Sequence, residues 1–343
     1  MSFVVSVCVP AFERVEYLSR LVNSFRAQNY ATKELCISDD STDDAVETYV
    51  RELHDPAIRY MHNPGPRGLG HNLKHALEMA WGEIAVVLGD DDVLSSPDAL
   101  GCYADAAIRY PAARFFYANQ LQIDADDRVA FSYRYFSEER YFGPGTESLR
   151  DMWLRSVQIA GMGFRLSHDG LVPSLFPDEP SLFPQVICVG RLLINSGSVA
   201  IDKYVCSTRG HPMQLGALAA QGKLVSSAHE QQGGSELVGI VKDLAQTHPA
   251  ELGPLTESLE RHIVVNFAGS MPNIRLNAGL PALRRLTGLM LQQSPYARRS
   301  VWLRVLYFGL LVVPEPLLRA CVALLKRLYV LVRHPQPSTP FPT

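Results

Sequence analysis

The first hundred residues alternate between two hydrophobic patterns. Short apolar runs rich in β-branched residues predict strands over residues 3–10, 34–40, 58–63 and 84–88. Between these runs, apolar residues recur at helical spacing and predict helices over residues 16–28, 43–53 and 70–81. Strands that alternate with helices favour parallel pairing in a sheet that helices cover. The pattern therefore predicts an α/β fold for this part of the chain.

The pattern becomes less regular after about residue 112. Residues 114–135 predict two strands around a turn at Asp124 to Asp127, which is typical of a hairpin added to the sheet. The next segments predict a helix over 148–160, an irregular proline-rich stretch over 168–185, a helix over 186–197 and a strand over 198–207. Residues 213–293 have a mainly helical pattern, and the last nine, PQPSTPFPT, predict a disordered tail.

Composition and charge exclude several classes of protein. The net charge of −3 argues against a general nucleic-acid binder, which would be basic. The six cysteines are scattered without a C-x-x-C pair, which indicates reduced cysteines and not a disulfide framework or a zinc site. No basic region followed by a long apolar run stands at the N-terminus, so we expect no signal peptide. These features predict a cytoplasmic protein.

The carboxyl ends of the four predicted strands carry Pro10, Asp39 with Asp40, Asn63, and the run Asp90 to Asp92, so that three of them end in polar residues. The carboxyl ends of parallel strands meet at one edge of a sheet, where ligands bind. Three adjacent carboxylates repel one another unless a cation or hydrogen-bond donors neutralise them, so the aspartate run suggests a divalent metal. The alternative is that these acids only form turns and helix caps.

These motifs, taken in order, resemble those of a family 2 glycosyltransferase with the GT-A fold. The resemblance lies in VCVPAFER, CISDDSTDD, GLGHN with Ala76 after it, and GDDDVL. It covers about the first 95 residues strongly and the next 115 weakly. It implies an α/β fold with a Rossmann-like mixed sheet flanked by helices, followed by a mainly helical C-terminal extension.

The resemblance also implies a division of the chain. A GT-A domain would cover residues 1–212, with a nucleotide-sugar half over 1–112 and an acceptor half over 113–212. A helical extension would follow over 213–295, then basic amphipathic helices over 296–334 and the disordered tail over 335–343.

Residues at the first two strand ends are implied to hold the donor nucleotide: Pro10, Ala11, Phe12, Glu13 and Asp40. Phe12 would lie against the nucleobase, and Asp40 would accept a hydrogen bond from the ring N–H of that base. The alternative is that Phe12 belongs to the core and Asp40 caps the next helix. Asp39 is expected to be the capping or structural member of the aspartate pair.

Arg67 and His71 lie at or beside the start of the third predicted helix, where the family often places a basic residue near the nucleotide. A helix N-terminus attracts anions, so these residues would hold the diphosphate. The alternative places both on the surface without a ligand.

The aspartate run departs from the family's metal motif, D-x-D-D, because Gly89 stands at its first position. The resemblance then implies Asp91 and Asp92 as ligands of Mg²⁺ or Mn²⁺, with Asp90 also near the nucleotide. Such a cation would stabilise the charge that develops on the leaving diphosphate.

The general base is not marked by a motif. Family members carry a Glu-Asp pair before the helix at 186–197, where this chain has Pro184 and Gln185. The nearest acids, Asp178 and Glu179, are the catalytic candidates, with Asp178 preferred and Asp169 next. The alternative is that FPDEP is only a rigid surface turn.

Residues 296–334 are basic and apolar, with seven Arg or Lys against Glu315, a net charge of +6. The first apolar run ends at Pro314, short of the ~20 residues that a membrane crossing requires. After it, Arg319, Lys326 and Arg333 share one predicted helix face. The opposite face is apolar: Leu317, Cys321, Leu324, Leu328 and Val332. This pattern is typical of a helix on an anionic membrane surface. Alternatively, the apolar face packs on its own domain or on a sister subunit of a homo-oligomer.

Residues and resemblance together predict an inverting, metal-dependent glycosyltransferase that moves a sugar from a nucleotide-sugar donor to an acceptor hydroxyl. A lipid-linked glycan of cell-surface polysaccharide synthesis is the expected acceptor, and the enzyme would be peripheral to the inner face of the cell membrane. One alternative is a nucleotidyltransferase with a similar sheet, although no glycine-rich triphosphate loop with a lysine follows the first strand. Another is a non-catalytic scaffold with a GT-A-like fold.

Overall fold

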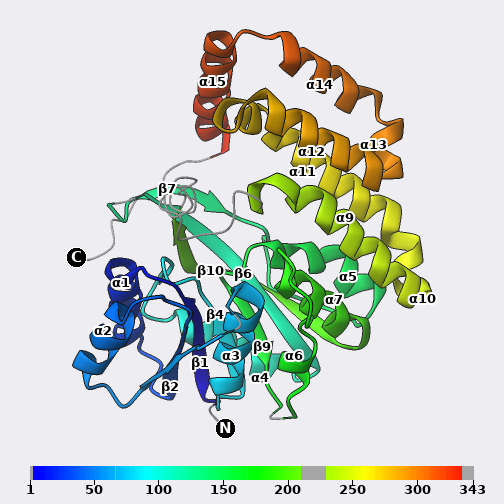
Figure 1. Ribbon diagram of the computed structural model, residues 1–343. Helices are drawn as coiled ribbons and strands as arrows, with labels where there is room; N and C mark the ends of the chain where they lie inside the picture. Colours follow the sequence, from blue (N-terminus) through cyan, green and yellow to red (C-terminus); the bar gives the residue numbers. More distant parts are fainter. Residues whose placement is uncertain (1–2, 66, 125, 168, 210–228, 334–343) are drawn as a thin grey trace. The chain divides into compact units, whose positions relative to one another are not determined.

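The computed structural model describes residues 3–65, 67–124, 126–167, 169–209 and 229–333, with the backbone alone over 229–233 and 326–333. The chain divides into two compact units (Figure 1). The first consists of Met1–Pro212 and Leu244–Leu255, and the second of Met213–Asp243 and Thr256–Thr343. The helical pattern of 213–228 and the predicted tail over 335–343 lie outside the described residues.

A mixed sheet of ten strands among the described residues forms the centre of the first unit. Its parallel part has the order β3 (Ile58–His62), β2 (Lys33–Asp39), β1 (Val5–Ala11) and β4 (Ile84–Val87). The sheet continues through β9 (Met162–Arg165), β6 (Ala113–Ile123), β10 (Gly197–Arg209) and β5 (Val93–Leu94). Two further strands, β7 (Val129–Tyr133) and β8 (Arg140–Phe142), pair with β6 and β10. The predicted α/β fold, the parallel pairing and the hairpin are confirmed.

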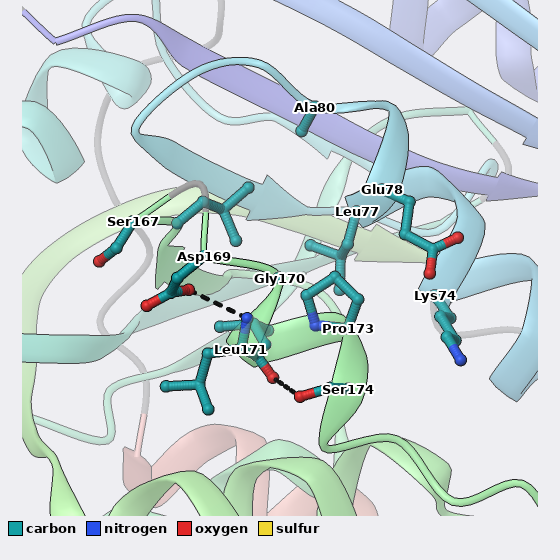
Figure 2. A pocket seen from close by; sticks show the side chains of 12 residues that line it. Lys74, Leu77, Glu78, Ala80, Ser167, Asp169, Gly170, Leu171, Pro173 and Ser174 are labelled. Atoms are coloured by element: carbon teal, nitrogen blue, oxygen red, sulfur yellow. Dashed lines mark hydrogen bonds between the residues drawn. The ribbon is translucent and has the colours of Figure 1, made fainter.

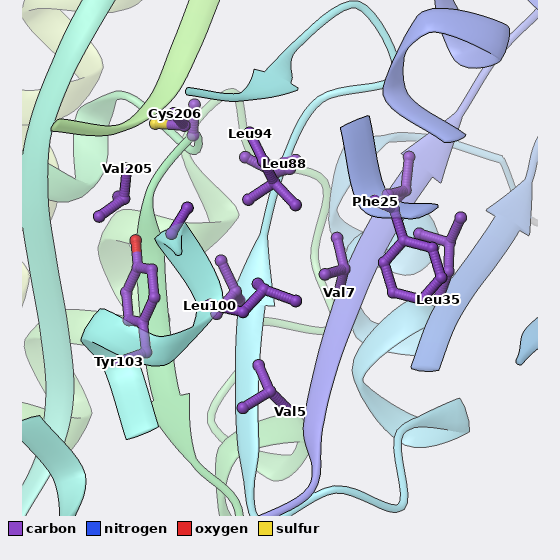
Figure 3. Packing of buried hydrophobic residues seen from close by; sticks show 14 of the residues in the cluster. Val5, Val7, Phe25, Leu35, Leu88, Leu94, Leu100, Tyr103, Val205 and Cys206 are labelled. Carbon is purple, nitrogen blue, oxygen red and sulfur yellow. The ribbon is translucent and has the colours of Figure 1, made fainter. Parts of the chain in front are cut away.

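Helices pack on this sheet because each has an apolar face. α1 (Val15–Arg26), α2 (Ala45–Leu53) and α4 (Ala99–Arg109) share one buried core with β1 and β4 (Figure 3). α3 (Leu69–Met79) packs on β1 and β2, and α7 (Pro184–Asn195) packs on β6. The shorter helices of this unit are α5 (Thr146–Asp151), η1 (Trp153–Val157), α6 (Leu171–Ser174), α10 (Pro249–Leu252) and η2 (Gly253–Leu255).

The hydrophobic pattern missed three short strands, β5, β8 and β9. β9 lies between β4 and β6 and is antiparallel to both. It has four residues, and one of them is Gly163, where a Cβ would come within 2.8 Å of the Tyr103 ring. A strand this short, with a glycine that the packing demands, carries no readable alternation. The single helix predicted over 148–160 is also wrong, because α5 ends at Asp151 and a 3₁₀ turn follows.

The second unit is helical in all its described residues. It contains the first part of α9 (His229–Thr247), then α11 (Thr256–Asn277), α12 (Gly279–Gln293) and α13 (Pro295–Arg299). The helical prediction for 213–293 is confirmed where the structure describes it. Two serines are N-caps of the helices that follow them: Ser294 accepts a hydrogen bond from Ala297 N, and Ser300 accepts one from Leu303 N.

Two helices separated by Pro314 end the described chain, α14 (Val301–Val312) and α15 (Glu315–Arg333). Both pack on α11 (Figure 1). None of the described helices is long and apolar enough to cross a membrane.

Candidate functional site

The carboxyl ends of β1, β2, β3 and β4 are joined by a buried network of polar side chains. Asp40, directly after β2, accepts hydrogen bonds from Asn63 Nδ2 (2.9 Å) and from the backbone N–H of Gly68 (2.7 Å). Asn63 directly follows β3, and its Nδ2 also donates to Ser38 Oγ (2.8 Å). The residues that the sequence placed at separate strand ends therefore meet at one edge, as predicted.

The first turn of α3 closes this network. Asn72 donates from Nδ2 to the carbonyl oxygen of Ala11 (2.9 Å), and its Oδ1 lies 3.3 Å from Asn63 Nδ2. His75 Nδ1 lies 2.9 Å from Asn63 Oδ1. Asn72 and Asn63 are buried, so these hydrogen bonds hold α3 against the ends of β1 and β3.

The two aspartates after β2 have different partners. Asp39 is fully buried and accepts hydrogen bonds from Ser41 N (2.9 Å) and Tyr60 Oη (2.8 Å). These contacts tie the β2 turn to β3, which is the structural role expected for Asp39. Asp40 faces the loop between β3 and α3. Since a carboxylate has about four lone-pair sites, Asp40 can accept a further N–H while it keeps Asn63 and Gly68.

The aspartate run after β4 is held by the residues after β1. Asp90 accepts a hydrogen bond from Phe12 N (2.9 Å) and forms an ion pair with Arg14. The same guanidinium donates from Nη1 to Asp91 Oδ2 (2.8 Å). Arg14 is therefore a counter-ion for two of the three carboxylates. It neutralises part of the negative charge for which the sequence analysis suggested a metal.

Gly89 explains why the run departs from D-x-D-D. The backbone N–H of Gly89 donates to Asp92 Oδ2 at 2.8 Å. A Cβ at Gly89 would lie 3.0 Å from that oxygen and 3.1 Å from Asp91 Oδ1. A larger residue there would crowd both carboxylates.

Burial governs the charge of this cluster. It raises the pKa of Asp90 to about 6, against the opposing effect of the Arg14 guanidinium. Burial, and next the charge of Asp91, raise the pKa of Asp92 well above its usual range. Asp91 is the most exposed of the three carboxylates. With a pKa of about 6, Asp90 is mainly ionised at neutral pH, where it faces the Arg14 guanidinium.

The geometry limits how these residues could hold a metal. Nowhere in the described residues do three or more His, Cys, Asp or Glu side chains come together in a group that could hold a metal ion. Asp90 and Asp92 are turned toward backbone N–H groups, which leaves Asp91 as the accessible carboxylate. This still fits Mg²⁺ chemistry, because Mg²⁺ is usually held by one or two carboxylates together with substrate phosphates and water. Of the two ligands predicted, Asp91 fits better than Asp92.

The segment after β1 lies between β2 and β4. Glu13 has a left-handed backbone (φ 56°), which is rare for residues other than glycine, and its N–H donates to Ser41 Oγ (2.8 Å). Pro10 and Ala11 are buried in β1, and Phe12 is half-buried. Strained backbone of this kind is frequent at ligand sites.

Arg67 and His71 lie beside this edge, at the start of α3. Arg67 is exposed and His71 is half-buried. Neither makes a hydrogen bond or ion pair with another described residue, so the fold leaves both available to a ligand.

The start of α7 lies beside the start of α3. The two are so close that a Cβ at Gly70 would come within 3.1 Å of Pro184. Gln185 is buried there, donates to Val157 O (3.3 Å), and has no partner for its Oε1 among the described residues. Asp178 and Glu179 are exposed on the preceding segment and pair with no described residue. Pro184 is six positions after Asp178, which gives the intervening chain a reach of about 20 Å.

Asp169 lies at the other edge of the sheet. It follows β9, whose last residue, Arg165, pairs with the first residue of β4. Its carboxylate accepts a hydrogen bond from Leu171 N and contacts Arg114, and these contacts lower its pKa. A groove of about 410 Å³ lies there between α3 and residues 166–167 and 169–174 (Figure 2). The second choice for the base is therefore wrong in position, because the strand carboxyl ends face away from Asp169.

The sequence missed Arg14 and Asn72 as site residues. Asn72 had a signal, since it is a polar residue between the apolar positions Leu69 and Leu73 of a helix. Arg14 ends the motif VCVPAFER, but its pairing had only the indirect signal that an aspartate run needs a counter-ion.

The comparisons with known proteins agree with this geometry. The family model described as Glycosyl transferase family 2 matches residues 6–168, which confirms the resemblance drawn from the motifs. The GalNAc(5)-diNAcBac-PP-undecaprenol beta-1,3-glucosyltransferase of Campylobacter jejuni is 35% identical over 97 residues, 26% of this chain and 30% of that protein. The abequosyltransferase RfbV of Salmonella typhimurium is 31% identical over 96 residues, 26% of this chain and 29% of that protein. Such matches span between 13% and 42% of the length of the curated relatives.

Solved structures share the fold at low sequence identity. TarS 1–349 of S. aureus in complex with UDP-GlcNAc has a TM-score of 0.61 at 15% identity, over 89% of this chain and 88% of that one. The mannosyltransferase PcManGT of Pyrobaculum calidifontis, in complex with GDP-Man and Mn²⁺, has a TM-score of 0.50 at 17% identity, over 91% and 87% of the two chains. The predicted GT-A fold is thereby confirmed.

Proposed function

We propose that this chain, whose residues 6–168 belong to glycosyl transferase family 2, transfers a sugar from a nucleoside diphosphate to an acceptor hydroxyl. The observation that carries the proposal is the strand-end edge. There Asp40 pairs with Asn63, Arg14 pairs with Asp90 and Asp91, and Asp91 keeps part of its side chain open to solvent. An edge of this kind offers a carboxylate for a base N–H and a helix N-terminus for a diphosphate.

On the donor side, Phe12 would lie against the nucleobase and Asp40 would accept its N–H. Arg67 and His71 would contact the diphosphate, since both lie at the start of α3 with no partner among the described residues. Asp91 would hold a divalent cation, Mg²⁺ or Mn²⁺, which supplies Lewis-acid stabilisation of the leaving diphosphate. Arg14 would keep Asp90 in place and add positive charge beside Asp91.

On the acceptor side, we assign the proton transfer to Asp178, with Glu179 beside it as the weaker candidate. The acceptor oxygen forms a bond to the anomeric carbon and its proton passes to the Asp178 carboxylate. The bond from that carbon to the diphosphate oxygen breaks, and the nucleoside diphosphate leaves with the electron pair. Attack opposite the leaving group inverts the anomeric configuration. Support for Asp178 is its place on the segment that leads to α7, at the start of α3.

The proposed acceptor is a lipid-linked glycan, with the chain peripheral to the inner face of the membrane. Two relatives support this class by their names, the Campylobacter jejuni undecaprenol-linked glucosyltransferase and the Escherichia coli diphosphoundecaprenol glucosyltransferase WfgD, which is 29% identical over 91 residues.

Product analysis tests the proposal. Purified chain with labelled sugar nucleotide and a membrane extract should release nucleoside diphosphate and move the label into lipid. A nucleotidyltransferase would instead release pyrophosphate from a nucleoside triphosphate and a sugar phosphate. A scaffold would give neither product. Asp91→Asn should abolish the nucleoside diphosphate, while the matched variant Asp98→Asn at the start of α4 should leave it unchanged.

A further inference from the structure

An apolar stripe runs along the surface of the second unit. Four apolar residues of α14 are more than half exposed: Val301 (67%), Val305 (66%), Phe308 (61%) and Val312 (79%). Their spacing of three or four residues puts them on one side of the helix. We call this side the α14 stripe. Exposed apolar residues that share a helix face mark an interaction surface, whereas scattered ones do not.

The other side of α14 fixes the helix to its unit. Leu303 and Leu310 are buried, and α14 packs on α11. Ser300 caps the helix through Leu303 N. The stripe is therefore exposed on a helix whose other side is already packed and whose N-terminus is capped.

The charge around the stripe is positive. Arg304 lies on α14 beside Val301 and Val305, and Arg298 and Arg299 form the last turn of α13; all three are exposed. The acid of this region, Glu315, is paired with Arg319 in its own helix. Trp302 is 42% exposed next to the stripe. Arginine and tryptophan beside an apolar helix face are the side chains found where a helix lies in a membrane interface.

The first described turns of α15 repeat this pattern in the same unit. Leu317 and Leu324 are exposed on one face, Leu318 is buried, and Arg319 lies on the face opposite Leu317. The side chains of Lys326, Leu328, Val332 and Arg333, which the sequence also assigned to this helix, lie outside the described residues. α15 therefore carries exposed apolar residues of its own, in addition to the α14 stripe.

We propose that the α14 stripe docks on an anionic lipid surface. Lipid acyl chains would cover Val305, Phe308 and Val312, and anionic headgroups would meet the arginines. A second copy fits less well, because a two-fold interface brings the same patch of both copies together and would set arginine against arginine. The inference rests on the proposed function only in that a lipid-linked acceptor gives the docking a purpose.

Vesicle sedimentation of the full chain tests this surface. Wild type should bind vesicles that contain phosphatidylglycerol and leave neutral phosphatidylcholine vesicles mostly free, with binding weakened by salt. The double variant Val305→Asp with Phe308→Asp should lower binding about tenfold or more. The matched control is Val265→Asp on α11, where an exposed valine lies outside the stripe, and it should bind as wild type does.

A charge variant keeps the test independent of the apolar substitutions. Arg298→Gln, Arg299→Gln and Arg304→Gln together should reduce the salt dependence of binding and leave the thermal midpoint within about one degree, because all three arginines are exposed. Wild type that does not bind anionic vesicles overturns the proposal. So does a wild-type dimer in light scattering that the aspartate variant converts to monomer without any vesicle binding, which would assign the stripe to a second copy.

Donor binding measured on the same samples separates this proposal from the proposed function. Vesicle binding without any sugar-nucleotide binding would leave the docking surface standing and reject the transferase. Sugar-nucleotide binding without vesicle binding would reject the docking surface and leave the proposed transferase standing.

Discussion

Two acidic regions of the first unit differ in how their carboxylates are held. At the ends of β2 and β4, Asp39, Asp40 and Asp90 are buried and accept hydrogen bonds from residues of other elements. On the segment before α7, Asp178 and Glu179 are exposed and pair with no described residue. The difference teaches that the fold holds the residues of the proposed donor site in advance, whereas the proposed general base is not held by other described residues. Catalytic contacts do often tighten only when substrates bind.

The largest effect on turnover is expected at Asp91, which is neither buried like Asp90 nor exposed like Asp178. Asp91 lies in the run after β4, yet it keeps access to solvent. Asp91→Asn removes the charge that would hold the cation, so turnover should fall on the order of a thousandfold. The variant should unfold at the same temperature as wild type. Turnover near wild type, measured by release of nucleoside diphosphate, would remove Asp91 from the mechanism.

Arg14→Met tests whether the donor side depends on its buried ion pair. The loss of Arg14 leaves Asp90 charged and buried, which should cost on the order of 3 kcal/mol of unfolding free energy at pH 8. The pKa of Asp90 in the folded state, about 6, is raised above its ordinary value. Its contribution to stability is therefore present at low pH and is lost as pH rises through 6.

Without Arg14 the pKa of Asp90 should rise further, so the variant should lose more stability at pH 8 than at pH 5. Urea unfolding at the two pH values measures this. The control is Arg20→Met on α1, whose ion pairs with Glu16 and Asp127 are exposed and should contribute at most about 1 kcal/mol. Equal losses for Arg14→Met at both pH values would contradict the pairing. Mn²⁺ should restore stability in Arg14→Met more than in Arg20→Met, since a cation can replace the missing charge.

Asp178→Asn tests the acceptor side of the comparison. Turnover should fall about a hundredfold, the usual loss for a positioned general base. Donor affinity and thermal stability should stay unchanged, because the side chain is exposed and unpaired among described residues. Glu179→Gln is the matched control and should lose much less. If Asp178→Asn and Glu179→Gln both keep near-normal rates, the base lies elsewhere.

Asp40→Ala should have the smallest effect on function. It should weaken nucleotide binding about tenfold, the cost of one charge-assisted hydrogen bond. The loss of its contacts with Asn63 and Gly68 should also lower stability. The control is therefore Asp39→Asn, which disturbs the same turn at a residue with a structural role, and the nucleotide affinities of the two variants are compared. The base-reading role fails if nucleotides with different bases keep their wild-type affinities.

The sequence predicted that polar residues meet at the strand-end edge because this edge follows from regular alternation of strands and helices. The strands β1 to β4 alternate with helices of readable apolar spacing. Polar residues of the network, Asp40, Asn63 and Asp90, come soon after β2, β3 and β4. The acceptor side could not be predicted in this way. β9 is short and contains Gly163, and the position of Asp169 depends on its antiparallel direction. Arg14 was missed because an ion pair between residues 76 apart leaves no local pattern.

The central claim is that the strand-end edge binds a sugar nucleotide. Its most direct test is a thermal-shift panel of the full chain with UDP-, GDP-, dTDP- and CDP-sugars, each with and without Mn²⁺. A ligand at about a hundred times its dissociation constant stabilises the native state by about 2.7 kcal/mol, so one base should raise the melting temperature by a few degrees. We predict that this shift needs Mn²⁺ and disappears in Asp91→Asn. A panel in which no sugar nucleotide shifts the melting temperature, or in which Asp91→Asn responds as wild type does, would contradict the account.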